Sequence, residues 1–255
     1  MIKYIRRKII PAKIRAMILL MRKLYTDKVW PIKRITYHND GLITFHGSDF
    51  LKDPLFTESY KLGRATGSWG DYDCEWRAYV ACWAAAKGKS LEGDFVECGV
   101  NRGGLSRMVM NYIDFNKLTD KKFYLLDTYC GFPNKHKKLA SVHPSSYSEC
   151  YEDVVKTFSK FKNAVIVRGP VPDTLPEVKA KKVCYLSLDM NCAEPEVAAA
   201  EFFWDKMTSG AVIVMDDYNM APEYHRIKEA FNAFAEKKGM QILALPTGQG
   251  LIFKP

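Results

Sequence analysis

The sequence predicts an α/β protein with a doubly wound, mostly parallel, seven-stranded sheet, a C-terminal antiparallel hairpin and an N-terminal helical arm. Three observations predict this fold. Short apolar runs alternate with helical patterns from residue 73 onward, as in parallel sheets covered by helices. A turn that contains glycines joins the first of these runs to a helix between Asp94 and Ser106. The last two apolar runs are separated only by the turn residues 246–250, which favours a hairpin.

The charge of the chain is concentrated at its N-terminus. The 255 residues include 38 lysines and arginines and 29 aspartates and glutamates, a formal net charge of +9. Residues 1–25 hold eight of the basic residues and no acidic residue, so the remainder is close to neutral. A basic face across the domain, as nucleic-acid binding requires, is therefore not predicted.

The cysteines predict a reduced, cytoplasmic protein. There are seven of them, an odd number, and no two are spaced as C-x-x-C. This usage is typical neither of a disulfide framework nor of a zinc site.

Residues 1–29 form a basic amphipathic arm in this interpretation. Its apolar side chains recur at helical spacing, at Ile10, Ile14, Met17, Ile18, Met21, Leu24 and Tyr25. Two interpretations stay open: residues 1–25 lie on anionic lipid, peripheral to the inner membrane face, or the helix packs on the body or on another subunit of a homo-oligomer. The apolar run 16–21 is too short to span a membrane.

Residues 30–72 are rich in aromatic and turn-forming residues and show no long regular period. We expect an irregular segment here. It is either a lid over the binding site of the following domain or a plain extension.

The domain at residues 73–255 opens with a helix from Asp73 to Lys87, which Gly88 ends. Strands are expected at 95–98, 123–127, 164–167, 183–188, 211–215, 241–245 and 251–254. Helices are expected between them at about 103–112, 149–160, 195–207 and 222–238.

The turn after the first strand predicts a ligand cradle. Glycines at 99, 103 and 104 allow unusual backbone angles and close approach, and the N–H groups of the following helix would point at the ligand. The spacing is not that of the dinucleotide fingerprint, and Glu97 precedes the first glycine. An acid there suits a ligand with positive charge, such as S-adenosylmethionine, better than a pyrophosphate. A tight turn without a ligand is the alternative.

Carboxylates follow three further strands, at the edge where parallel sheets bind ligands. Asp127 lies where an acid is expected to hold ribose hydroxyls. Asp189, Asp216 and Asp217 would meet at one rim, where their mutual repulsion calls for a divalent cation. Oxygen ligands favour Mg²⁺, with Mn²⁺ and Ca²⁺ as further candidates. As an alternative, one aspartate of the pair at 216–217 caps the next helix.

Taken as a set, these motifs resemble the macrocin-type family of metal-dependent S-adenosylmethionine O-methyltransferases, which act on sugar hydroxyls of natural products. The resemblance covers about residues 73–255 and rests on the segments 95–104, 126–133, 169–176, 188–189 and 216–218. It implies a class I methyltransferase-like fold, with Asp189, Asp216 and Asp217 as Mg²⁺ ligands. The candidate cofactor-binding residues are Glu97, Gly99, Asn101, Arg102, Gly103, Asp127 and Thr128.

One departure concerns the general base. Members of the family carry a second aspartate two residues after the first metal ligand, whereas this chain has Asn191, and an amide cannot take up a proton. Asp189 aided by the metal, or solvent, would then accept the proton. His225 and Glu194 are the other candidates, and loss of catalysis is the last alternative.

The resemblance implies direct attack of an acceptor hydroxyl on the sulfonium methyl group. Residues 30–72, the loop 130–148 with His136 and His143, and Gln249 are expected near the acceptor. Three other functions are alternatives. A nicotinamide-dependent dehydrogenase leaves the three aspartates unexplained, a non-catalytic adaptor would account for Asn191, and a catechol-type methyltransferase would differ only in its acceptor pocket.

Overall fold

The structure is a computed structural model that describes residues 14, 16–19, 35–143 and 147–255. The chain divides into two compact units, one of residues 1–38 with 42–48 and the other of residues 39–41 with 49–255. Strands β1 (Tyr37–Asn39) and β2 (Leu42–Thr44) form a hairpin with a two-residue turn. Its turn residues Asp40 and Gly41 both have positive φ, 54° and 72°, as the type I′ turn of an Asp-Gly hairpin requires.

The larger unit is built on a seven-stranded sheet of order β5-β4-β3-β6-β7-β9-β8. Five strands are parallel, and β9 pairs antiparallel with both β7 and β8. The doubly wound sheet with a terminal hairpin is therefore confirmed. The strands are β3 (Asp94–Cys98), β4 (Phe123–Asp127), β5 (Ala164–Arg168), β6 (Val183–Leu188), β7 (Met207–Met215), β8 (Leu243–Ala244) and β9 (Gly250–Phe253).

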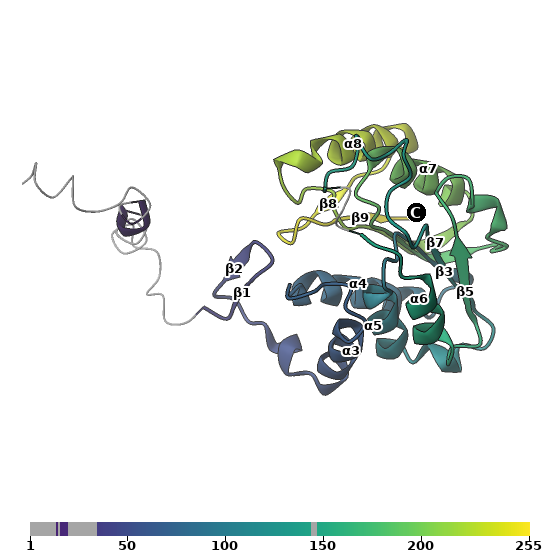
Figure 1. Ribbon diagram of the computed structural model, residues 1–255, viewed down its shortest axis with the longest axis horizontal. Helices are drawn as coiled ribbons and strands as arrows, with labels where there is room; N and C mark the ends of the chain where they lie inside the picture. The colour runs from purple at the N-terminus through teal and green to yellow at the C-terminus, as the bar shows by residue number, and fades with distance from the viewer. Residues whose placement is uncertain (1–13, 15, 20–34, 144–146) are drawn as a thin grey trace, which may run out of the picture. The chain divides into compact units, whose positions relative to one another are not determined.

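Helices cover both faces of this sheet (Figure 1). One face carries α3 (Pro54–Arg64), α4 (Glu75–Gly88), α5 (Gly104–Tyr112) and α6 (Tyr151–Phe158). The other carries α7 (Ala193–Trp204) and α8 (His225–Lys238). Alternating strands and helices therefore yield two apolar cores, one on each side of the sheet.

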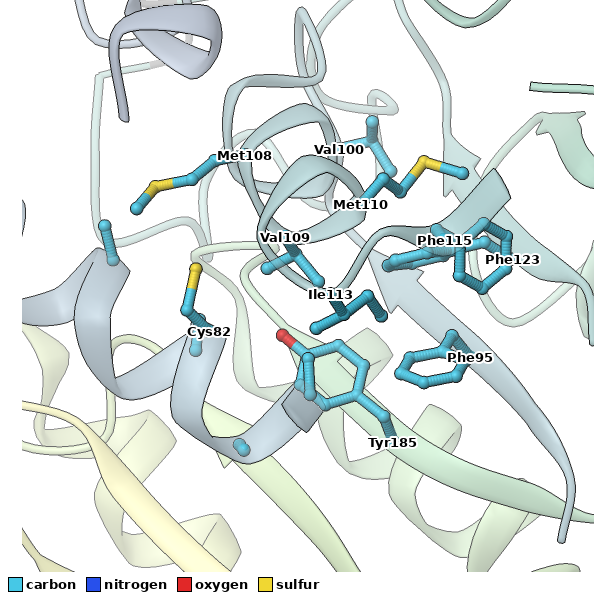
Figure 2. Close-up of a cluster of buried hydrophobic side chains, with 14 of the residues drawn as sticks. Cys82, Phe95, Val100, Met108, Val109, Met110, Ile113, Phe115, Phe123 and Tyr185 are labelled. Atoms are coloured by element: carbon cyan, nitrogen blue, oxygen red, sulfur yellow. The ribbon is translucent and has the colours of Figure 1, made fainter. Parts of the chain in front are cut away.

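The core beneath α4 and α5 is packed with aromatic rings. Figure 2 shows Phe95, Phe115, Phe123 and Tyr185 together under the α5 side chains, and all four are fully buried. Phe95 and Phe115 meet edge to face with ring centroids 5.5 Å apart. This packing fixes β3 and β6, whose carboxyl ends carry the predicted site.

The expectation of an irregular segment over 30–72 is wrong for residues 54–64, which form α3. Asp53 caps the helix by accepting a hydrogen bond from the Leu55 N–H at 2.8 Å, and Pro54 occupies its first turn. Phe56 and Tyr60 are buried and join the core. The Asp-Pro pair at 53–54 is a helix-start signal that could have predicted α3, but the turn-forming residues around it hid that signal.

Smaller differences concern element ends and the arm. The helix expected at 222–238 begins with a 3₁₀ turn at Pro222–Tyr224, and the strand expected at 241–245 has only two residues. All seven cysteines are free. Residues 14 and 16–19 are helical and exposed, but most of the predicted arm at 1–29 lies outside the described residues. Within the described part of the chain, no helix has both the length and the apolarity to cross a membrane.

Candidate active site

The carboxyl ends of β3, β4, β6 and β7 open into a cavity of about 400 Å³. Its lining brings together five carboxylates that the sequence placed at strand ends: Glu97, Asp127, Asp189, Asp216 and Asp217. Gly99, Asn101 and Thr128 line it as well. Parallel strands 4.8 Å apart necessarily bring such end residues to one rim.

Gly99 is required by close packing of two strand ends. Its φ is +95°, and a Cβ atom there would lie 1.9 Å from the Asp189 carbonyl oxygen. Any larger residue would therefore push β3 away from the loop after β6. The role of Gly99 is to let the two halves of the cavity wall meet.

Glu97 is a buried acid on the cavity wall. It is 1% exposed, and the Ser106 hydroxyl donates a hydrogen bond to its Oε2. Burial raises the pKa of Glu97 to about 8. A positively charged ligand beside it would favour the ionised form.

Asp127 is held by the glycine-bearing turn. The backbone N–H of Asn101 donates to its Oδ2 at 2.8 Å, and the N–H of Tyr129 donates to Oδ1 at 2.7 Å. The Thr128 hydroxyl lies 3.2 Å from the same Oδ1. Burial raises the pKa of Asp127, while these donors act in the opposite direction. The carboxylate is thereby fixed in place.

The start of α5 differs from the expectation that its N–H groups point at a ligand. Ser68 Oγ accepts the Gly104 N–H at 2.8 Å, so a residue of the segment before α4 caps this helix. Gly103 packs against the Phe158 ring, which a Cβ atom would approach to 2.5 Å. Arg102 pairs with Asp153 at 2.7 Å. Neither Arg102 nor Gly103 lines the cavity.

The three aspartates predicted to hold a metal do converge. One carboxylate oxygen from each of Asp189, Asp216 and Asp217 lies within 4.8 Å of the others. Burial, reinforced by the neighbouring carboxylates, raises the pKa of Asp189 and of Asp217. Asp217 Oδ2 is buried and has no hydrogen-bond partner among the described residues. An orphaned oxygen in an all-carboxylate set fits a hard divalent cation.

Two residues whose contact with Asp216 the sequence does not predict hold this carboxylate. Arg77, in the first turn of α4, donates from Nη1 to Asp216 Oδ2 at 2.6 Å. Gln249 is fully buried and donates from Nε2 to Asp216 Oδ1 at 2.8 Å. Gln249 is expected near the acceptor, but it does not line the cavity, and it contacts the acidic cluster through Asp216.

Asn191 lies beside the cluster in a left-handed conformation, with φ of 53°. Its Nδ2 donates to Asp189 Oδ1 and to the Tyr147 hydroxyl, both at 3.2 Å. The Tyr224 hydroxyl donates to Asn191 Oδ1 at 3.3 Å. The amide therefore belongs to a hydrogen-bonded wall of the cavity.

The remaining candidate bases lie elsewhere. His225 is exposed, its Nδ1 is 3.0 Å from the Pro222 carbonyl oxygen, and it does not line the cavity. Glu194 contacts Cys192 and is also outside the cavity lining. His136 lines the cavity, and burial lowers its pKa. His225 is close in sequence to Asp217, but the intervening turn places it outside the cavity.

The strand order and the cofactor-type turn after the first strand of the sheet define a class I methyltransferase fold. The chain belongs to the macrocin O-methyltransferase (TylF) family, whose model matches residues 77–243. This confirms the family resemblance read from the motifs.

Similar proteins are distant in sequence. Demethyldecarbamoylnovobiocin O-methyltransferase of Streptomyces niveus is 24% identical over 53% of this chain and 56% of its own length. Mycinamicin III 3''-O-methyltransferase of Micromonospora griseorubida is 20% identical over 62% of this chain and 66% of its own length. The chain thus matches less than two thirds of the length of either relative.

Solved structures share the fold. The O-methyltransferase NovP superposes with a TM-score of 0.65 at 18% identity, covering 78% of this chain and 97% of that one. An O-methyltransferase from Bacillus cereus in complex with SAH gives a TM-score of 0.53 at 12% identity, covering 81% and 96%.

Proposed function

We propose that this protein is an S-adenosylmethionine-dependent, Mg²⁺-assisted O-methyltransferase that acts on a hydroxyl group of a sugar or a glycosylated small molecule. The observation that carries the proposal is the shared cavity. Glu97 and Asp127, suited to a cationic nucleoside, line the same space as Asp189, Asp216 and Asp217. Family membership and the SAH complex of a protein with this fold support it.

The cofactor half of the cavity is assigned to the turn after β3 and the end of β4. Glu97 faces the positive charge of the cofactor, Asp127 binds the ribose hydroxyls, and Gly99 lets the Asp189 backbone pack against this turn. Asn101 and Thr128 complete this half. Arg102 and Gly103 act indirectly, by holding α6 beside the turn.

The metal half is assigned to the three aspartates. When bound, Mg²⁺ supplies Lewis-acid chemistry that favours the ionised form of a hydroxyl group. The residues of the chain position the acceptor and receive its proton. Asp189 is our choice of proton acceptor because its neighbour Asn191 cannot take up a proton and His225 lies outside the cavity.

The acceptor half is lined by aromatic side chains. Trp69, Tyr147 and Tyr224 combine an apolar ring with a polar group, and Phe132 adds a purely apolar ring, which suits the mixed apolar and hydroxylated faces of a sugar. Trp69 belongs to the segment 30–72, and Phe132 and Tyr147 belong to the loop 130–148, so both segments contribute to the acceptor half. A catechol would use the same metal half, so the acceptor has to be tested directly.

Calorimetric titration tests the proposal. S-adenosylmethionine is titrated into the full chain with Mg²⁺ and with a chelator, and Mg²⁺ is titrated separately. We expect cofactor binding, and a Mg²⁺ heat that Asp217→Asn abolishes and that the control His225→Ala retains. No cofactor binding under either condition would refute the methyltransferase assignment.

Transfer of a radioactive methyl group to simple glycosides and to catechols then identifies the acceptor class. Transfer to glycosides supports the proposal, and transfer to catechols alone replaces it. Cofactor binding without transfer to either panel would favour the adaptor function, for which Asn191 is the specific observation.

The location proposed for the protein is the cytoplasm, at the inner face of the membrane. The eight basic residues among residues 1–25 would face anionic lipid. A contact between copies of the chain through this arm is the alternative.

A further inference from the structure

Arg77 is the only lysine or arginine among the described residues that line the cavity. Its guanidinium lies between two carboxylates, with Nη1 2.6 Å from Asp216 Oδ2 and Nε 2.6 Å from Asp40 Oδ2. The Arg77 side chain is 15% exposed. Its charge therefore acts on the acidic cluster with little screening by solvent.

Asp40 lies outside the cavity lining, in the turn at 39–41, which belongs to the larger unit. Its side chain is only 3% exposed, and the Tyr72 hydroxyl donates to its Oδ1. Burying a carboxylate is costly unless it is paired and hydrogen-bonded. The ion pair of Asp40 with Arg77 is thus buried and hydrogen-bonded, unlike an exposed surface ion pair.

Together with Gln249, Arg77 occupies both oxygens of Asp216. The other two aspartates remain open toward the cavity. Arg77 Nη1 stays 4.0 Å from Asp217 Oδ1, and Asp217 Oδ2 has no partner among the described residues. Arg77 is therefore hydrogen-bonded to Asp216 but not to Asp217.

We infer that Asp40 is a positioning residue for the metal site, acting through Arg77. The inference rests on the proposed function. Asp40 holds the guanidinium at the Asp216 edge of the cluster, which leaves Asp189 and Asp217 free for a divalent cation. Without the Asp40 charge, Arg77 is attracted only by the cluster and moves onto Asp217.

Two separate causes lower the cation affinity when Asp40 loses its charge. Asp40→Asn removes a negative charge near the cation site, and it releases a positive charge toward the same site. Both weaken cation binding, which we expect to fall by about tenfold. Tyr72→Phe removes only one hydrogen bond to Asp40, so a smaller loss of about threefold is expected.

The test is Mn²⁺ binding by the full chain, followed by the electron paramagnetic resonance signal of free Mn²⁺. Asp40→Asn should bind Mn²⁺ about tenfold more weakly than the wild type, and Asp40→Glu, which keeps the charge, should recover part of the loss. Glu201→Gln is the control, because Glu201 pairs with Lys237 and Lys238 on a distant helix surface.

A double-mutant cycle separates this role from a general loss of stability. If Asp40 acts through Arg77, Asp40→Asn should weaken Mn²⁺ binding clearly less in the Arg77→Met background than in the wild type, because only the direct loss of the Asp40 charge remains. Unchanged Mn²⁺ affinity in a folded Asp40→Asn protein overturns the inference. If that variant does not fold, unchanged affinity in Tyr72→Phe overturns it. A wild-type protein that binds no Mn²⁺ would instead refute the proposed metal function.

Discussion

At the scale of single residues, Glu97 shows how burial changes the protonation of an acid on the cavity wall. Its carboxyl group is enclosed on the cavity wall, where the Ser106 hydroxyl donates a hydrogen bond to it, and burial raises its pKa to about 8. The ordinary value is 4.5, so near neutral pH the acid is protonated in the free protein. Binding of a cationic cofactor beside it would favour release of that proton.

This shift has a consequence for stability. Since the pKa is higher in the folded state than in the unfolded state, the folded state binds more protons between pH 4.5 and about 8. The stability that Glu97 contributes is therefore fully present below pH 4.5 and is lost as the pH rises to about 8.

Glu97→Gln should flatten this pH dependence and weaken S-adenosylmethionine binding by about tenfold or more, because a charge-assisted contact is lost. Thermal unfolding between pH 5 and 9 and calorimetric titration measure the two effects. A variant that keeps the wild-type slope of stability against pH would contradict the assignment of that slope to Glu97.

At the scale of elements, α3 contributes to the core rather than covering it loosely. Phe56 is 1% exposed, and its ring meets that of Phe50 edge to face at 4.9 Å. The segment that follows α3 provides Ser68, which caps α5, and Trp69 and Tyr72, which line the cavity. The packing of α3 therefore determines where these three side chains lie.

Phe56→Ala should lower the free energy of unfolding by about 3 to 5 kcal/mol, because it leaves a cavity in the core. Its neighbour Leu55 is 48% exposed and provides a matched control, since Leu55→Ala should cost less than about 0.5 kcal/mol. Urea denaturation distinguishes them. Equal losses in the two variants would mean that α3 is not part of the core.

At the scale of the whole molecule, charge is divided unequally along the chain. Residues 1–25 carry eight basic residues without an acid, whereas the rest is nearly neutral and its cavity is lined by five carboxylates. A region of one sign attracts anionic surfaces over about a Debye length, so the effect depends on salt. The basic arm is therefore proposed to act separately from catalysis.

Deletion of residues 1–25 should abolish binding to vesicles that contain anionic lipid, while binding of S-adenosylmethionine stays unchanged. Co-sedimentation with anionic and with neutral vesicles measures the first effect, and calorimetry the second. Replacing the eight basic residues by glutamine in the full chain tests the charge alone. Vesicle binding that survives the deletion would contradict the lipid interpretation and favour a protein contact.

Most of the α/β domain could be predicted because its signals are local. Each strand from β3 to β7 is a short apolar run, and Asp127, Asp189 and Asp216 directly follow or end such runs. Parallel pairing then brings strand ends to one edge without further information. The convergence of the three aspartates could be predicted for this reason, as could the positions of Glu97 and Gly99 beside them.

Only the tertiary structure decided the contacts between residues that are distant in sequence. Arg77 and Asp216 are 139 residues apart, and Arg77 and Asp40 are 37 apart. Whether a helical residue such as Arg77 faces a site depends on how the helix is rotated against the sheet, which the packing of the core determines. His225 is the opposite case: it is close to Asp217 in sequence, but the turn between them places it outside the cavity. The sequence by itself determined which carboxylates share the rim, and the packing decided which side chains hold them there.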